Sequence, residues 1–340
     1  NCKLFCSIEA TTTLTHREVL AQMDIPFLCQ SIEEQLIRLK AELHAQWLSF
    51  NRELKQGKLS HLEYNKGTQT LTWRKPKVDK QSTHEQSFYE QLPFCDIADV
   101  FRLVNHECKC LSALTPLQPR YAKKSADTNS LIAVIMAQAM NYGNLVLSRT
   151  SDIPYHVLET TYQQYLRQAS LKAANDRISN AISGLPIFPH YSFDLDVLYG
   201  AVDGQKFGVE RPTVKARHSR KYFGRGKGVV AYTLLCNHIP LNGYLIGTQD
   251  YEGHHVFDIW YRNTSDIVPT VITGDMHSVN KANFAILHWF GLSFEPRFTN
   301  LQNQLKELYC ADDPTLYEKC LIRPVGQIDL SVIVDEKSNI

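Results

Sequence analysis

The sequence predicts an α/β protein in which a helical N-terminal region leads into a mixed β-sheet flanked by helices. Between residues 96 and 183 apolar side chains recur at helical spacing, and beyond residue 194 short apolar runs typical of strands alternate with helical segments. A chain of 340 residues with 44% hydrophobic and 21% charged residues is globular, which excludes a disordered or fibrous protein. At roughly 150 residues per domain, this length suggests about two domains.

Charge and hydropathy exclude other kinds of protein. Thirty-six basic and thirty-five acidic residues give a formal net charge of +1, so a surface for nucleic acid must be local. The longest apolar run, residues 131–137, is far shorter than the roughly 20 residues that span a bilayer, and no signal segment opens the chain. Nine cysteines, an odd number, indicate reduced thiols. We therefore predict a soluble, cytoplasmic protein with no membrane partner.

A long amphipathic helix is predicted after Ser31. Ser31 and Glu34 form a capping box, which satisfies amide groups at a helix start, and apolar residues then recur every three or four positions up to Leu54. We interpret this segment as a core helix or a short helical hairpin. A coiled-coil dimer is the alternative, although its seam would contain Gln46.

A small β-hairpin is predicted next. Turn-forming residues at 64–67 precede strand-favouring residues at 68–73, and Pro76 stops the strand. The polar stretch 75–86 has no apolar period, which indicates a loop or linker. Residues 1–90 are therefore predicted to be a helical region with a small β-hairpin.

Residues 91–190 are predicted to form a helical bundle. Apolar residues mark helices near 97–104 and 157–169, and the segment 129–140 is apolar on nearly all sides, which is typical of a buried central helix. Gly184 and Pro186 end the last helix in the usual order.

Residues 191–340 are predicted to form the mixed sheet. Five apolar runs indicate strands, at 197–202, 229–235, 244–247, 268–273 and 293–298, and two segments between them indicate helices, at 252–262 and 279–290. Short links allow the first three strands to pair antiparallel, whereas the last two need helical crossovers and hence parallel neighbours. That order is found in ribonuclease-H-like (integrase-like) domains.

The chain ends near a further alternating run, residues 328–334, which predicts a last strand. It begins at Asn1 rather than Met and stops at Ile340 without a polar tail. Both ends are expected to be cuts in a longer protein, which would leave the sheet domain incomplete.

Two aspartates are candidates for metal chemistry. Asp203 follows the first predicted strand and Asp275 follows the fourth, and these two strands are neighbours in a ribonuclease-H-like sheet. A hard cation such as Mg²⁺ takes one or two carboxylates, and two such ions can support phosphodiester chemistry. The alternative is that each aspartate only forms a turn after its strand.

A basic segment, residues 211–227, is the candidate DNA-binding surface. It contains no acid and is interleaved with Tyr222 and Phe223, and its glycines would let a nucleic-acid strand lie close to the backbone. The alternative is a solvated loop, and repulsion between like charges predicts poor order without DNA. The candidate DNA-binding residues are Lys215, Arg217, Arg220, Lys221, Arg225 and Lys227.

Several motifs in order resemble the transposases of the Tn-three (Tn3) family of replicative bacterial transposons. They are VDGQKF at 202–207, KYFGRGKG at 221–228, TGD at 273–275 and GLSFEPR at 291–297. Upstream, residues 98–105 and 139–143 resemble the helical part that precedes them in the family. The resemblance covers roughly residues 30–325.

The resemblance implies an enzyme with an integrase-like fold that uses an Asp-Asp-Glu triad and Mg²⁺ or Mn²⁺, with two ions in the complete enzyme. Such enzymes nick the 3′ ends of the transposon and join them to target DNA. The implied partners are double-stranded DNA, both transposon ends and target, and further copies of the chain in a transpososome. By resemblance, Asp203 and Asp275 are the first two acids of the triad, and the setting is the bacterial cytoplasm.

The third acid is expected to be absent. In the family it lies on a helix well beyond the second aspartate, whereas this chain ends at residue 340, 65 residues after Asp275. Glu307, Glu318 and Glu336 are present, but none lies in a context that resembles the motif. Val202 also replaces the family's usual serine, and Gly274 and Met276 depart from the usual neighbours of the second aspartate.

Three interpretations remain open at this point. The chain can be part of a strand transferase, or a DNA-binding remnant without catalysis. It can also be another ribonuclease-H-like nuclease that uses one of these three glutamates as its third acid.

Overall fold

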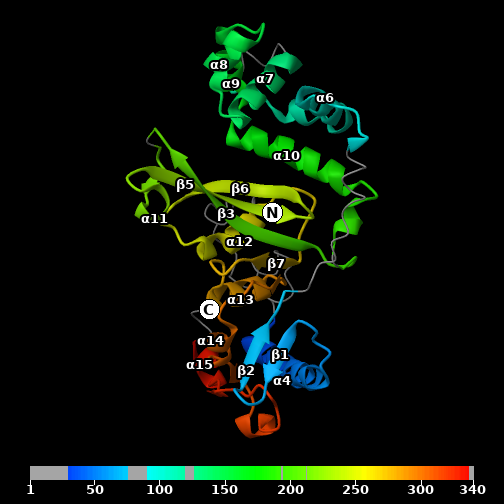
Figure 1. Cartoon of the computed structure of the whole chain (residues 1–340), viewed down its shortest axis with the longest axis vertical. Coiled ribbons are helices and arrows are strands. Elements are labelled where there is room, and N and C mark those ends of the chain that lie inside the picture. Colours follow the sequence, from blue (N-terminus) through cyan, green and yellow to red (C-terminus); the bar gives the residue numbers. More distant parts are fainter. Residues whose placement is uncertain (1–29, 76–89, 119–125, 193, 212, 337–340) are drawn as a thin grey trace, which may run out of the picture. The chain divides into compact units, whose positions relative to one another are not determined.

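A computed structural model describes residues 30–75, 90–118, 126–192, 194–211 and 213–336 of the chain (Figure 1). Its contacts define two compact units. The terminal unit comprises Asn1–Gln86, Ala285–Leu292 and Arg297–Ile340, and the central unit comprises Ser87–Phe284 and Ser293–Pro296. The polar stretch predicted to be a linker lies, from residue 76 on, outside the described residues.

The terminal unit begins with the predicted amphipathic helix. Helix α4 (Ile32–Gln56) is continuous, so the hairpin interpretation is wrong. Its capping box is confirmed, because the Glu34 amide donates to Ser31 Oγ and the Ser31 amide donates to Glu34 Oε2, each at 3.2 Å. Gly57 ends the helix in the left-handed conformation, with φ of 67°.

The predicted β-hairpin is also confirmed. Strands β1 (Leu62–Asn65) and β2 (Thr70–Trp73) pair antiparallel. The first strand takes up part of the predicted turn, and Asn65 Oδ1 accepts hydrogen bonds from the amides of Gly67 and Thr68. This side chain closes the turn and explains why the chain reverses here.

The core of the terminal unit joins residues from both ends of the chain. One cluster contains Trp47 together with Cys310, Tyr317 and Cys320. In a second, Leu54 and Leu71 meet Ile322, whose amide donates to Asn51 Oδ1 at 2.8 Å. The C-terminal elements are helix α14 (Leu301–Leu305), strand β9 (Tyr309–Cys310), the 3₁₀ helix η5 (Pro314–Tyr317), strand β10 (Gly326–Gln327) and helix α15 (Leu330–Asp335).

The strand predicted at 328–334 is wrong. Most of it forms helix α15, because the Asp329 side chain accepts a hydrogen bond from the Ser331 amide and caps a helix start. Alternation of apolar and polar residues over five positions, 328–332, could not distinguish this short helix from a strand.

Four predicted helices are present in the central unit: α6 (Ile97–Cys108), α7 (Thr128–Ala139), α9 (Tyr155–Tyr165) and α10 (Gln168–Ser183). The helix expected to reach residue 169 ends at Tyr165, and the 3₁₀ helix η1 (Cys110–Ala113) and helix α8 (Gly143–Thr150) were not predicted. Helix α7 contacts α8 and α9. Its Leu131, Val134 and Ala137 are at most 4% exposed, as expected of a central helix.

The mixed sheet has six strands in the order β4-β5-β3-β7-β8, with β6 paired to β5. Their bounds are β3 (Tyr199–Val209), β4 (Arg217–His218), β5 (Lys227–Cys236), β6 (Ile239–Gly247), β7 (Val271–Gly274) and β8 (Ser293–Phe294). The predicted pairing is confirmed, since β3, β5 and β6 pair antiparallel while β7 pairs parallel with β3 and with β8.

Helices cover this sheet and connect its parallel strands. Helix α10 packs against β6, and helix α12 (Val256–Tyr261), which follows the 3₁₀ helix η4 (Glu252–His255), packs against β5 and β6. Figure 1 shows α10 and α12 on opposite sides of the sheet. Helix α13 (Lys281–Trp289) lies in the crossover between β7 and β8.

Strand β3 is longer than its apolar residues predict. The predicted strand stopped at Val202, but residues Asp203 to Val209 continue it and pair with β5 over their whole length. The neighbouring strand β7 pairs only with the first four residues of β3, from Tyr199 to Val202. Asp203 therefore lies inside a strand, at the position where the neighbouring strand ends.

Candidate active site and nucleic-acid interface

The sheet brings Asp203 and Asp275 together. Val202 of β3 lies opposite Gly274 of β7 in a parallel pair, so the two aspartates are the next residues along both strands. Neighbouring strands lie about 4.8 Å apart. Asp203 is exposed and Asp275 is half-buried.

Each carboxylate has one oxygen held by the backbone. Asp203 Oδ1 accepts a hydrogen bond from the Gly204 amide at 2.8 Å, and Asp275 Oδ1 accepts one from the His277 amide at 2.9 Å. Within the described residues, no basic side chain forms an ion pair with either aspartate. Two carboxylates with a free oxygen each fit a hard cation that retains several waters.

Two buried hydroxyl groups lie near Asp275. Tyr232 and Ser278 are at most 1% exposed, and the oxygens of both side chains are without a hydrogen-bond partner among the described residues. Burial raises the pKa of Tyr232 well above its ordinary value, and the charges of Glu252 and Asp275 act in the same direction. The phenol therefore stays protonated and uncharged.

A third carboxylate lies next to the same strand, and sequence reasoning missed it. Glu252, at the start of η4, is 8% exposed, and its Oε1 lies 3.0 Å from Nζ of Lys206. Gly204 makes room for it, because a Cβ added there would lie 2.6 Å from the Glu252 carboxylate. One sequence feature could have suggested a buried acid here. Gly204 and Lys206 are two residues apart and therefore share one face of the strand, where they leave space and a positive charge.

Lys206 remains charged in this setting. Burial acts to lower its pKa, but the hydrogen bond and charge of Glu252, with smaller contributions from Tyr222 and Asp203, outweigh burial and raise the pKa. Its ammonium also lies 4.7 Å from the centre of the Tyr222 ring, and the Lys221 ammonium lies 4.9 Å from it. Tyr222 thus connects the strand of Asp203 to the basic segment.

No group of three or more His, Cys, Asp or Glu side chains in the described ranges is arranged to hold a metal ion. Asp203 and Asp275 are brought together where β7 ends beside β3, whereas Glu307, Glu318 and Glu336 belong to the terminal unit.

The described part of the basic segment contains two short elements. They are the two-residue strand β4 and the helix α11 (Arg220–Phe223). Thr248 Oγ1 donates to the Arg217 carbonyl at 3.1 Å, which fixes β4 beside the end of β6. All six candidate DNA-binding residues are exposed, and none forms an ion pair with a described carboxylate.

The Phe223 ring packs on two glycines of the sheet and holds the basic segment against it. Gly208 of β3 lies opposite Gly228 of β5, and the Phe223 ring covers the flat patch that they leave. Gly224 turns the chain with φ of 58° and ψ of −111°, a conformation open to glycine, and the Gly226 amide donates to the Phe223 carbonyl at 2.8 Å. The Tyr-Phe-Gly-Arg-Gly-Lys-Gly sequence is therefore an anchor that presents its basic residues outward.

Replacing Gly228 should release this anchor. A Cβ at this position would lie 2.1 Å from the Phe223 ring and 2.5 Å from the Phe207 carbonyl oxygen, and the carbonyl belongs to a paired strand. We expect Gly228→Ala to lower the free energy of unfolding by about 1–3 kcal/mol, measured by urea denaturation. Gly243→Ala is the matched control, because its Cβ would meet ordinary contacts of 3.5 Å. Equal stability of the two variants would contradict the role of the anchor.

A groove lined by basic residues lies on the face of the sheet that helix α10 covers. It has a volume of about 930 Å³ and lies between α10 and strands β5 and β6. Its lining includes Lys172, Lys215 and Arg262 but no acidic side chain. Thr233, which also lines it, lies directly opposite Asp203, so the groove reaches the face that carries the acid.

These features agree with a comparison of the sequence with known families. The sequence profile of the Tn3 transposase DDE domain matches residues 99–340. The chain belongs to this family. The match includes both aspartates, Glu252 and the whole basic segment.

Two transposases are similar to the chain over part of their length. The transposase for transposon Tn4556 from Streptomyces fradiae is 25% identical over 244 residues, which cover 71% of this chain and 27% of that protein. The transposase for transposon gamma-delta from Escherichia coli (strain K12) is 25% identical over 174 residues, which cover 50% of this chain and 17% of that protein. The aligned part is therefore about a quarter and about a sixth of these relatives.

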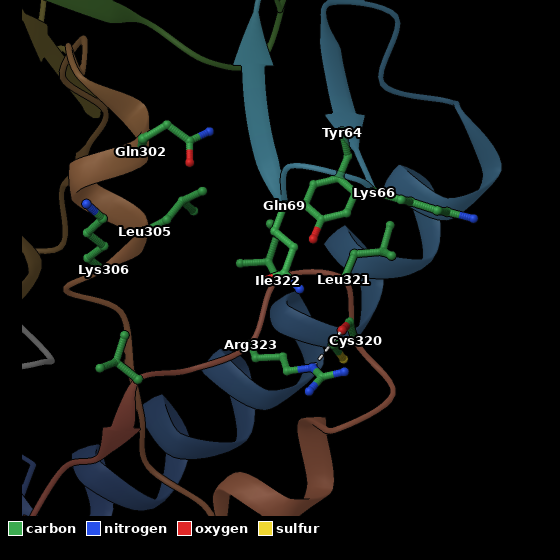
Figure 2. Close-up of a pocket in the computed structure, with 11 residues that line it drawn as sticks. Tyr64, Lys66, Gln69, Gln302, Leu305, Lys306, Cys320, Leu321, Ile322 and Arg323 are labelled. Carbon is green, nitrogen blue, oxygen red and sulfur yellow. Dashed lines mark hydrogen bonds between the residues drawn. The ribbon is translucent and has the colours of Figure 1, made fainter.

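The Tn3-family chain has a second pocket, which contains none of the predicted site residues. It lies within the terminal unit and has a volume of about 450 Å³. Figure 2 shows Gln302 and Lys306 on one side of it and Tyr64 and Gln69 on the other. Arg323 Nε donates to the Cys320 carbonyl at 3.4 Å, which fixes its side chain at the pocket.

Among the described residues, no helix combines the length and the apolar character needed to cross a bilayer.

Proposed function

We propose that this chain contains the ribonuclease-H-like core of a Tn3-family transposase that cleaves and joins DNA strands with Mg²⁺ or Mn²⁺. The observation that carries the proposal is the parallel pairing of β3 with β7, which places Asp203, inside β3, next to Asp275, the residue that follows β7. Three antiparallel strands followed by two parallel ones, in the order β6-β5-β3-β7-β8, support the ribonuclease-H-like assignment.

Asp203 and Asp275 are the residues that would hold the metal. Backbone amides fix Oδ1 of each carboxylate, which leaves Oδ2 of each free to face the ion. A bound ion of this kind polarises a phosphoryl oxygen and neutralises charge on the attacking and leaving oxygens, and two ions do so together in the complete enzyme. Burial keeps the nearby Tyr232 hydroxyl protonated, with the charges of Glu252 and Asp275 acting in the same direction, so it adds no further negative charge to the site.

The proposed substrate is double-stranded DNA, both transposon ends and target. Lys215, Arg217, Arg220, Lys221, Arg225 and Lys227 would contact phosphates, because all six are exposed and lack carboxylate partners in the described residues. The groove beside α10 would extend this surface towards Asp203, since its charged lining is entirely basic. Association of several copies on DNA is part of the same proposal.

The third acid would come from chain beyond these residues, so the domain at 191–340 would be partial. Two aspartates alone hold a second metal ion poorly. We therefore expect the 340-residue chain to bind DNA and one ion weakly, but neither to nick nor to join transposon ends. The measurement is a strand-transfer assay on labelled transposon-end DNA with Mg²⁺ or Mn²⁺.

A longer chain that carries the distal glutamate is the positive control for this assay and should join strands. Robust joining by the 340-residue chain would contradict the absence of a third acid. Failure of the longer chain to nick or join would instead favour a DNA-binding remnant without catalysis.

A further inference from the structure

The pocket in the terminal unit has apolar walls that are held by the core. Its volume of about 450 Å³ lies within the usual range for a ligand site, roughly 300–1,000 Å³. Tyr64, Leu305 and Leu321 line it, and each also packs against the buried cluster that contains Leu54 and Leu71. Figure 2 shows Tyr64 and Leu305 on opposite sides of the opening. A flat apolar group can therefore enter between an aromatic ring and an aliphatic side chain.

Two glutamines at the same pocket supply hydrogen-bonding groups. Gln302 Nε2 donates a hydrogen bond to the Leu71 carbonyl, which fixes the carboxamide and leaves its Oε1 as an acceptor. Gln69 directly precedes β2 and has φ of 53°, a left-handed conformation that suits glycine better. A residue in such a conformation indicates a use of its side chain. Carboxamides of this kind form hydrogen bonds with the edges of nucleobases.

The charged side chains of the pocket are all basic. Lys66, Lys306 and Arg323 line it, no described acid does, and none of the three forms an ion pair with a described carboxylate. Arg323 uses Nε for the Cys320 carbonyl, which leaves its two terminal nitrogens for another acceptor. Figure 2 shows Lys66 and Lys306 on opposite sides of the pocket, so these two residues do not converge on one point. Charges spread in this way fit successive phosphates of a strand better than one phosphate ion.

We propose that this pocket takes one base of an unpaired stretch of DNA, with the base against the Tyr64 ring and the flanking phosphates at the three basic side chains. Every base has a face that can stack on an aromatic ring, so the site would bind single-stranded DNA with little preference for sequence. The inference goes beyond the proposed function, because the pocket belongs to the terminal unit and contains neither candidate metal ligand.

The experiment is a fluorescence anisotropy titration with a labelled oligothymidylate of about eight nucleotides, a length within the range of single-strand sites. It uses the 340-residue chain with Arg217, Arg220 and Lys221 reversed in charge, so that the basic segment of the central unit does not contribute. Tyr64→Leu keeps an apolar side chain on the core but removes the ring, and should weaken binding by about 5- to 150-fold, the value of one base–aromatic stack. The matched control is Tyr155→Leu, which removes a tyrosine of α9 that is 46% exposed and should leave binding unchanged.

Further variants separate binding from folding. Gln69→Gly suits the left-handed backbone and should leave unfolding in urea unchanged, yet weaken oligonucleotide binding by about 2- to 10-fold, the value of one neutral hydrogen bond. Replacing Lys66, Lys306 or Arg323 with glutamine should make the slope of log affinity against log salt concentration shallower by about 0.7 for each residue. Lys58→Gln removes an exposed lysine of the same unit and is the control for this slope.

Absence of oligonucleotide binding by the chain with the reversed segment would overturn the proposal, and so would unchanged binding in a folded Tyr64→Leu variant. If Tyr64→Leu does not fold, unchanged binding in both Gln69→Gly and Lys306→Gln overturns it instead. Equal competition by polyglutamate would show a surface for any polyanion, and thymidine monophosphate that binds as tightly as the oligonucleotide would show a site for a free nucleotide. Either result excludes the role in strand binding. Asp203→Asn should not change oligonucleotide binding, so failure of this pocket and failure of the proposed metal site are separate outcomes.

Discussion

Asp203→Asn is expected to weaken Mn²⁺ binding to this chain by on the order of 100-fold, and Asp275→Asn should have an effect of the same size. The two carboxylates are the proposed ligands, and loss of even a supporting group around a metal commonly costs about 10–100-fold in affinity. Asparagine has nearly the same shape as aspartate, and its Oδ1 can still accept the hydrogen bond from the amide of Gly204 or of His277. The sheet should therefore stay folded in both variants. The measurement is a calorimetric titration of the 340-residue chain with Mn²⁺.

The matched control is Asp152→Asn, which removes an exposed carboxylate from the helical part of the central unit. Its Mn²⁺ affinity should equal that of the unchanged chain. In a longer chain with the distal glutamate, Asp203→Asn or Asp275→Asn should also abolish strand transfer. Retention of tight Mn²⁺ binding in either variant would show that the ion is held elsewhere.

Charge reversal of Arg217, Arg220 and Lys221 is expected to weaken binding of duplex DNA by about 10- to 100-fold at moderate salt. Each phosphate contact contributes about 0.9 to the slope of log affinity against log salt concentration. Loss of three contacts should therefore make that slope shallower by about 2.7. The measurement is a fluorescence binding titration repeated at several salt concentrations.

The control for this variant keeps the overall charge the same. Arg52, Lys58 and Arg149 are exposed basic residues outside the segment, and their reversal changes the net charge equally. If DNA affinity depended on net charge alone, both triple variants would lose it to the same extent. An unchanged salt slope after reversal within the segment would contradict its role as the phosphate-binding surface.

Much of the sheet could be predicted because its signals are local. Each of the five predicted strands carries an apolar run, and the length of each connection decides between antiparallel and parallel pairing. This reasoning was enough to place Asp203 and Asp275 on neighbouring strands, as the pairing of Val202 with Gly274 shows. Their role as metal ligands remains a prediction.

Other features depend on contacts between distant residues. The second half of β3 contains few apolar residues. It is a strand because every residue from Asp203 to Val209 pairs with a residue of β5. Glu252 looks like an ordinary surface acid in the sequence, and only the fold brings it against Gly204 and Lys206, 46 residues from the latter. In α15 a single cap at Asp329 outweighed the alternating pattern.

The terminal unit is built from segments at both ends of the sequence, and this determines when the protein can finish folding. The hydrogen bond between Asn51 and Ile322 spans 271 positions, so helix α4 leaves the ribosome long before the residues that cover it. The central unit lies between these two parts of the sequence and can fold during synthesis, as domains generally do. Until translation reaches Ile322, the apolar face of α4 that includes Leu54 lacks its final partner, and closing so long a loop is slow. Newly made chains therefore pass through a period in which one end is exposed to aggregation and to chaperones.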